Sequence, residues 1–206
     1  NVVLNPTTID TVNLHNQVKN QHTDKIVIGW TGTHSTVDYL KDLVPVLQKL
    51  EQEFDFEFRV ISNRAPDFEL KSMVYIPWKK ETEIADLLGF NFGVMPLTDD
   101  KWAKGKCGFK ALQYMSLGMP AVVSPVGVNV KIVTEGVDGF LCNSPTEWEN
   151  ALRKLITDET LRVAMGTAAR QTIVNHYSVL SNSGNFLSLF DANIASELRK
   201  LITLCD

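Results

Sequence analysis

The chain has 206 residues, of which 44% are hydrophobic and 21% are charged, so it is long enough for one sizeable domain with a real core. Its formal net charge of -4 argues against general nucleic-acid binding, which requires a basic surface to displace counterions. The 3 cysteines and 4 histidines are scattered and form no CxxC pair, so no metal site is predicted.

The sequence shows no targeting signal. No apolar run approaches the roughly 20 residues that a membrane-spanning helix needs, so no transmembrane segment is expected. The amino terminus lacks a basic stretch followed by an apolar one, which argues against a signal peptide. The dispersed cysteines favour a reducing compartment, and we expect a cytoplasmic protein.

Residues 1–24 are polar and without periodicity, which predicts an amino-terminal arm or linker. From residue 25 onward, apolar runs predict about six strands, at 26–30, 56–61, 73–76, 92–97, 121–124 and 139–142. Apolar residues spaced three or four apart predict helices between them, at 37–50, 79–88, 109–117 and 130–135. This alternation predicts right-handed βαβ crossovers, and hence an α/β fold with a Rossmann-like, doubly wound parallel sheet.

Two prolines mark the predicted helices. Pro45 lies inside the first of them and is expected to kink it, because proline removes one helix hydrogen bond. After Pro145 the chain is predicted to be helical, so extra helices follow the sheet. We assign 25–176 to the Rossmann-like domain and 177–206 to a C-terminal helix.

The loops after the strands are the expected place for a ligand, because doubly wound sheets bind ligands at the carboxyl ends of their strands. The first such loop carries Gly32, Thr33, His34 and Ser35. A glycine there can take a positive φ and lets backbone approach a ligand, and a threonine or serine can cap the next helix. The free N–H groups of that helix favour an anion. A tight turn without a ligand is the alternative.

A second loop, 101–110, combines four lysines with two glycines directly before a predicted helix. Mobile ammonium groups, close backbone approach and a helix amino end together suit a diphosphate. Lys110 and Gln113 lie on one face of that helix because they are three residues apart. A solvated basic loop, balanced by Asp99 and Asp100, is the alternative. Two such loops after strands of one sheet favour a shared anion site.

The segment 105–123, GKCGFKALQYMSLGMPAVV, resembles the signature of the group 1 glycosyltransferases of GT-B fold. That signature is E-x7-E, with the second Glu in E-A-M-A-x-G-x-P-V-V. The stretch 132–141, IVTEGVDGFL, is similar to the family's E-I-V-x-x-G-x-x-G-F-L. The triplet at 176–178, HYS, resembles the F/Y-S-W before the family's closing helix, and 3–10 resembles its I-P-N-G-x-D. The resemblance covers nearly the whole chain.

The resemblance implies the carboxyl-terminal, nucleotide-sugar-binding half of a GT-B enzyme of polysaccharide biosynthesis. The implied reaction is retaining transfer of a hexosyl-type sugar from a nucleoside-diphosphate sugar, with no cofactor or bound metal. The two loops and the matching positions together predict a diphosphate and sugar site at Gly32, Thr33, His34, Ser35, Lys106, Gly108, Phe109 and Lys110. The matching positions also imply ribose binding by Gln113 and base binding by Pro77 and Trp78. No catalytic residue is assigned.

Some positions depart from the family pattern. The first Glu, which binds donor-sugar hydroxyls in the family, aligns with Gly105, and the second Glu aligns with Gln113. The family's Arg and Lys pair has no match after Gly32, so Lys106 or Lys110 is expected to replace it. These departures leave open a catalytically inactive sugar-nucleotide or partner-binding module.

The implied partners are the nucleoside-diphosphate sugar and an amino-terminal acceptor domain of the same protein. The final helix, with Phe186, Leu189 and Phe190, would cross back to that domain, or its apolar face would drive self-association. Contact with the inner face of a membrane would come through the other domain. An NAD-dependent oxidoreductase is a further alternative. It needs G-x-G-x-x-G after the first strand and an acidic residue after the second, where this chain has SNR at 62–64.

Overall fold

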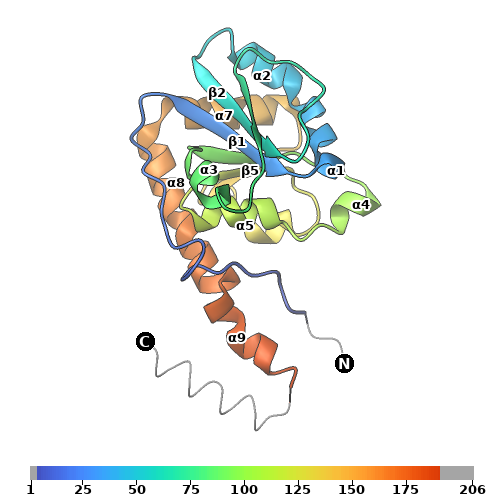
Figure 1. The fold of residues 1–206 in the computed structure, drawn as a ribbon, viewed down its shortest axis with the longest axis vertical. Coiled ribbons are helices and arrows are strands. Elements are labelled where there is room, and N and C mark those ends of the chain that lie inside the picture. Colours follow the sequence, from blue (N-terminus) through green and yellow to red (C-terminus); the bar gives the residue numbers. More distant parts are fainter. Residues whose placement is uncertain (1–3, 191–206) are drawn as a thin grey trace.

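The computed structural model describes residues 4–190. Residues 1–3 of the predicted arm and 191–206 of the predicted C-terminal helix lie outside the described residues. Six parallel strands form one sheet in the order β3-β2-β1-β4-β5-β6 (Figure 1). The strands are β1 Ile26–Gly32, β2 Phe56–Ser62, β3 Met73–Pro77, β4 Phe92–Met95, β5 Ala121–Val123 and β6 Gly139–Leu141. The predicted Rossmann-like parallel sheet is therefore confirmed.

Helices connect the strands and continue beyond the sheet (Figure 1). They are α1 His34–Val37, α2 Val44–Leu50, α3 Glu83–Leu88, α4 Lys101–Lys104, α5 Phe109–Ser116, α6 Asn129–Ile132, α7 Pro145–Thr157, α8 Glu159–Thr172 and α9 Val179–Leu187. A 3-10 turn η1, Asp38–Asp42, follows α1, and a π-helical turn η2, Ile173–Tyr177, follows α8.

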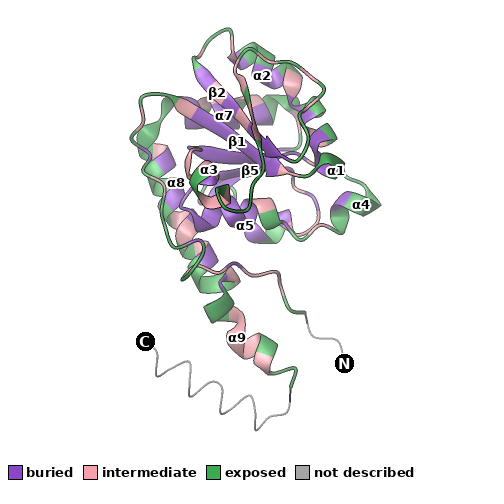
Figure 2. Cartoon of the chain, viewed as in Figure 1, coloured by how far each residue is buried: buried purple, intermediate pink, exposed green. Residues whose placement is uncertain are grey.

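Two hydrophobic layers enclose the sheet, because successive strand residues point to opposite faces. Ile28 packs in one layer with Leu47 of α2 and Leu152 of α7. Val27 packs in the other layer with Leu112 of α5. Figure 2 shows the strands buried between the helices, whose outer faces are exposed. The sheet is thus covered on both faces, as a doubly wound fold requires.

The helix predicted over 37–50 is divided rather than kinked. Pro45 lies in the first turn of α2. Proline has no N–H group, and a residue in the first turn of a helix needs none, so Pro45 begins a new helix where a kink was expected. The chain before it forms α1 and the tighter η1.

Other predicted boundaries also shift. The helix predicted over 79–88 begins only at Glu83, and the helix predicted over 130–135 ends at Ile132. The fourth strand ends at Met95, before a proline that cannot donate to a neighbouring strand. The lysine-rich loop contains the short helix α4, which was not predicted and which the Asp100 side chain caps.

The amino-terminal arm is extended and lies along the domain (Figure 1). The N–H of Lys19 donates to the carbonyl of Leu117 at 2.8 Å. The Gln21 side chain donates to the carbonyl of Asn91 at 2.7 Å, and the Asn91 side chain accepts from the N–H of Val27 at 2.8 Å. Hydrogen bonds therefore fix the arm to the residue that follows α5 and, through Asn91, to the first strand.

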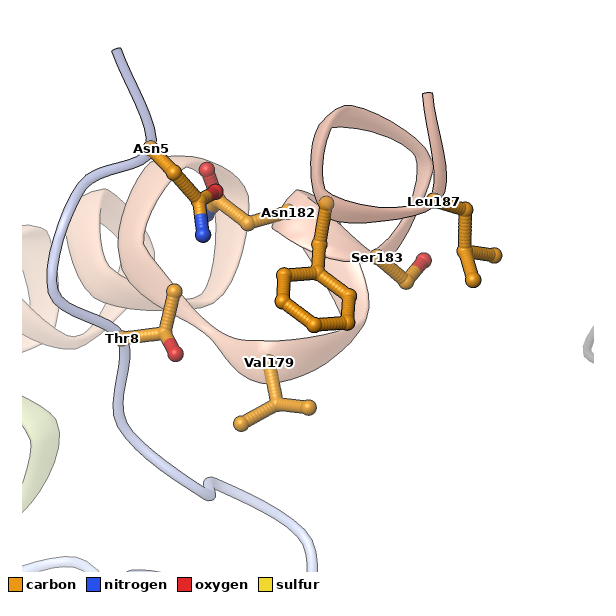
Figure 3. A pocket seen from close by; sticks show the side chains of 7 residues that line it. Asn5, Thr8, Val179, Asn182, Ser183 and Leu187 are labelled. Carbon is orange, nitrogen blue, oxygen red and sulfur yellow. The ribbon is translucent and has the colours of Figure 1, made fainter. Parts of the chain in front are cut away.

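The arm also pairs with the segment that leaves the domain. The N–H of Ile9 donates to the carbonyl of Tyr177 at 2.9 Å, and the N–H of Val179 donates to the carbonyl of Ile9 at 3.0 Å. The Asn185 side chain donates to the carbonyl of Leu4 at 3.0 Å. Side chains of the arm and of α9 surround a cavity of about 210 Å³ between them (Figure 3). Both segments thus leave the domain together.

Candidate functional site

The direction of winding reverses at the centre of the sheet. From β1 the chain proceeds to β2 and β3 on one side, and then to β4, β5 and β6 on the other. At the carboxyl ends of β1 and β4 lies a cavity of about 630 Å³, which we call the central cavity and which has the size of a small-molecule site. Its lining consists of Thr31, Gly32, Thr33, Ser35, Thr36, Asn63, Trp78, Glu83, Met95, Gly105, Lys106, Cys107, Gly108, Phe109, Lys110 and Gln113.

Most of the predicted site residues meet in this cavity. Those that line it are Gly32, Thr33, Ser35, Trp78, Lys106, Gly108, Phe109, Lys110 and Gln113. His34 and Pro77 are not part of the lining. The N–H of His34 donates to Oδ1 of Asn63 at 2.9 Å, beside the cavity, and Pro77 is the exposed last residue of β3. The amino ends of α1 and α5 therefore border one cavity, while the binding roles of these residues stay predictions.

Gly32 is a glycine because there is no room for a side chain. A Cβ atom at this position would lie 2.5 Å from Cη2 of Trp30 and 2.8 Å from Cε of Lys110. The φ of Gly32 is not positive, so the positive φ that the sequence suggested for this glycine is wrong. Gly32 thus permits close packing rather than an unusual backbone angle.

The first loop is ordered by side chains rather than by a helix cap. Thr33 precedes α1, but its side chain makes no capping hydrogen bond, so the expected cap is wrong. Its Oγ1 lies 2.9 Å from Oγ of Ser35, and the hydroxyl of Thr36 donates to the carbonyl of Thr33 at 3.1 Å. These bonds fix the shape of the loop where it borders the central cavity.

The amino end of α5 is built around Gly108. This residue has a φ of 71°, a left-handed angle that glycine adopts without strain. A Cβ atom there would lie 2.3 Å from Cδ1 of Ile132. No side chain of the described residues caps this end of α5, so the N–H groups of its first turn and its positive dipole end lie at the cavity.

Lys110 brings a partly buried positive charge to the cavity. Its Nζ lies 5.5 Å from the centroid of the Trp30 ring, and no ion pair with a carboxylate of residues 4–190 is present. Burial and, to a smaller extent, the charge of Lys106 lower the pKa of Lys110 to about 8. An anion in the cavity would oppose both effects, because an opposite charge nearby favours the charged form.

Two further lysines of the second loop, Lys104 and Lys106, lie in different settings. Lys104 forms an ion pair with Asp99 at 2.9 Å, on the solvent side, as the alternative interpretation expected for a basic loop. Lys106 lines the cavity, and its Nζ lies 5.1 Å from the centroid of the exposed Trp102 ring. Two lysines of the loop, Lys106 and Lys110, are therefore available to a ligand.

Asn63 and Glu83 line the cavity but were not predicted as site residues. Oε1 of Glu83 accepts hydrogen bonds from Nε1 of Trp78 at 3.1 Å and from Nε2 of Gln113 at 3.2 Å. Asn63 directly follows β2, and ligands of such sheets bind at the carboxyl ends of strands, so its position could have indicated a site residue. Glu83 gave no such signal, because it lies six residues beyond β3 inside a segment predicted to be helical.

Tyr114 connects the elements that form the cavity. Its hydroxyl accepts from the N–H of Thr31 at 3.0 Å and donates to the carbonyl of Val94 at 3.3 Å. The side chain is fully buried, and burial raises the pKa of the phenol above its usual value. Because α5 is thereby bonded to both β1 and β4, the walls of the cavity are positioned before any ligand arrives.

The described residues offer neither a metal site nor a membrane-spanning helix. No group of three or more His, Cys, Asp and Glu side chains that could bind a metal is found within residues 4–190. Over the same part of the chain, no helix has the length and apolar character needed to cross a membrane.

Comparison with protein families identifies the chain. The family model described as "Glycosyl transferases group 1" matches residues 25–158. The chain belongs to this family. The family resemblance drawn from the sequence is therefore confirmed. A comparison with curated protein sequences gives no match.

Solved structures of low sequence identity share the fold of this group 1 chain. TarM superposes with a TM-score of 0.69 at 18% identity, covering 88% of this chain and 38% of TarM. Anabaena HepE, solved with UDP and glucose, gives a TM-score of 0.61 at 13% identity, covering 87% of this chain and 48% of HepE. The C-terminal domain of LpcC from Francisella tularensis, a group 1 glycosyl transferase family protein, gives a TM-score of 0.59 at 15% identity, covering 84% of this chain and 97% of that domain. The GT-B type of fold is confirmed, and the chain spans less than half of TarM.

Proposed function

We propose that this chain binds the nucleoside-diphosphate sugar donor of a glycosyltransferase. The observation that carries the proposal is the partly buried ammonium of Lys110, which has no acidic partner among the described residues and lies at the uncapped amino end of α5. A cation in that setting is stabilised by an anion. Lys106 adds a second positive charge to the same cavity.

The same groups suit the chemistry of sugar transfer. When the bond between the anomeric carbon and the diphosphate oxygen breaks, negative charge develops on that oxygen. Fixed N–H groups and ammonium groups directed at it stabilise the departing diphosphate. We propose transfer of a hexosyl-type sugar with retention, on the resemblance of 105–123 to the family signature. The UDP in the structure of HepE supports a nucleoside diphosphate as the ligand.

We propose that the acceptor is bound by another domain, which packs on α9. Along and just beyond this helix Phe186, Leu189 and Phe190 are exposed to 49%, 48% and 54%. Apolar side chains gathered in this way mark an interaction surface. In the isolated chain the same surface would favour self-association.

A second candidate is a module that binds a sugar nucleotide or a partner without catalysis. It is favoured by Gly105, which places no carboxylate where the family binds the donor-sugar hydroxyls. A transfer assay with the full-length protein and the donor that binds would separate the two candidates, since only the first forms product.

The proposal is tested by calorimetric titration of the chain with UDP, GDP and ADP. We expect one of the three to bind, and Lys110→Ala to weaken it roughly tenfold or more, because a charge-assisted hydrogen bond is lost. Lys104→Ala is the matched control, since this lysine of the same loop is paired with Asp99 away from the cavity. The Lys104→Ala variant should bind the nucleotide with the affinity of the wild type. Equal effects of the two substitutions, or no binding by any nucleotide, would contradict the proposal.

A further inference from the structure

The central cavity contains one carboxylate that phosphate binding does not explain. Glu83 is the only acidic residue among the described residues of its lining. Near a diphosphate a negative charge would be unfavourable, and Glu83 forms no ion pair with Lys106 or Lys110. Its carboxylate instead accepts hydrogen bonds from two uncharged side chains.

Glu83 is fixed by one of its two oxygens. Oε1 accepts from the Trp78 indole at 3.1 Å and from the Gln113 amide at 3.2 Å. No hydrogen bond to Oε2 is present within residues 4–190. Because the side chain of Gln113 is 3% exposed, one donor to the carboxylate is itself firmly placed. The carboxylate is therefore oriented, and its second oxygen can accept from a ligand.

The position of Glu83 lies between the groups that we assign to the two ends of a nucleotide. Gln113 follows Lys110 by three residues on α5, about 4.5 Å along the helix axis. On its other side Glu83 contacts Trp78, the predicted base-binding residue. In a nucleoside diphosphate the ribose connects the base to the diphosphate, so a ribose would lie beside Glu83.

We propose that Glu83 accepts hydrogen bonds from the ribose hydroxyls and that Gln113 orients it. This inference rests on the proposed function. A carboxylate is an acceptor with two oxygens, which suits the paired donors of a vicinal diol. By resemblance the ribose is bound by the family's second Glu, which is Gln113 here. The carboxylate has thus moved from α5 to α3, and the amide at 113 now positions it.

The test compares each of UDP, GDP and ADP with its 2′,3′-dideoxy form, by calorimetric titration of the chain. For the nucleotide that binds, we expect the wild type to prefer the ribose form about tenfold or more, because a site built to pair hydroxyl groups discriminates against analogues that lack them. Glu83→Gln should reduce this preference to below about threefold. Glu81→Gln, an exposed acid of the same segment outside the cavity lining, is the matched control and should keep it.

A double variant tests whether the ribose-binding carboxylate has moved from position 113 to position 83. Gln113→Glu added to Glu83→Gln returns a carboxylate to the family's position, and we expect the preference for the ribose form to recover, with thermal unfolding confirming that each variant folds. A preference that survives Glu83→Gln, or a wild type that binds both forms equally, would overturn the inference while leaving the donor site intact. A wild type that binds none of the nucleotides would instead overturn the proposed function and the inference with it.

Discussion

Two cations of this protein lie in opposite settings. Arg153, on the outer face of α7, donates to Glu53 at 2.6 Å and to Glu149 at 3.1 Å, and its guanidinium lies 5.1 Å from the centroid of the Phe54 ring. These hydrogen bonds raise the pKa of Arg153. Lys110, in the central cavity, lies near an aromatic ring and another lysine and pairs with no carboxylate of residues 4–190, and its pKa is lowered to about 8.

The difference between the surroundings of Arg153 and Lys110 indicates different roles for the two charges. Arg153 is paired with carboxylates of the same chain, so it joins α7 to the turn that follows α2 and needs no ligand. Lys110 is unmatched among the described residues, so the folded protein keeps a charge that burial disfavours. Such perturbed groups cluster at functional sites.

The largest expected effect is that of pH on nucleotide affinity. Below a pH of about 8 Lys110 is already charged in the empty cavity, whereas above it the ammonium must be formed when the diphosphate binds. Each further pH unit then lowers affinity about tenfold, or roughly 100-fold by a pH of about 10. Titrations across this range measure it, and Lys110→Met should flatten the profile. A wild-type profile that is flat from about pH 7 to about pH 10 would remove Lys110 from the site.

A smaller effect is expected from Gly32→Ala. Its Cβ atom would displace the Trp30 ring and the Lys110 side chain, at a cost of about 1–3 kcal/mol in stability and with weaker nucleotide binding. For stability, Gly105→Ala is the control, because a Cβ there meets its nearest atom, the carbonyl of Trp102, at an ordinary 3.4 Å. Urea unfolding compares the two variants, and nucleotide titration compares Gly32→Ala with the wild type. An affinity of Gly32→Ala equal to that of the wild type would show that Gly32 does not position Lys110.

The smallest effects are those of the two cations on the empty protein, and they should differ in sign. The pKa of Lys110 is lower in the folded chain than the 10.5 of an ordinary lysine, so the unfolded chain binds more protons between about pH 8 and about pH 10.5. Wild-type stability should therefore rise with pH across that window. Near pH 7 Lys110→Met should raise the free energy of unfolding by about 1 kcal/mol.

Arg153→Met should instead lower the free energy of unfolding slightly, because it removes the surface ion pairs of Arg153 with Glu53 and Glu149. It should not change nucleotide affinity. Urea unfolding at a pH of about 7 compares the two variants. If both destabilise the protein, Lys110 has a structural partner and the contrast between the two cations fails.

Much of the fold follows from local pattern. Buried parallel strands are continuous apolar runs, so runs such as 26–30 predicted their own strands, and the glycines and lysines of 101–110 marked the second wall of the cavity. Sequence spacing could not show that Pro45 begins a helix, because its effect depends on where the preceding turn ends.

Tertiary contacts account for what the sequence did not predict at the site. Glu83 faces the cavity because α3 begins four residues later than predicted and because Gln113 and Trp78 fix its side chain. Nor could the local sequence separate Lys104 from Lys110. Lys104 pairs with an acid nearby in the sequence, whereas Lys110 on α5 lies over the ring of Trp30, which β1 brings from a distant part of the sequence.

The pairing of the arm with the start of α9 has a mechanical consequence. The backbone bonds that join Ile9 to Tyr177 and Val179 make the two segments one double-stranded joint. If a second domain is linked through the arm and packs on α9, it would move by hinge rotation about this pair of segments. Free rotation about one backbone bond would require these hydrogen bonds to break.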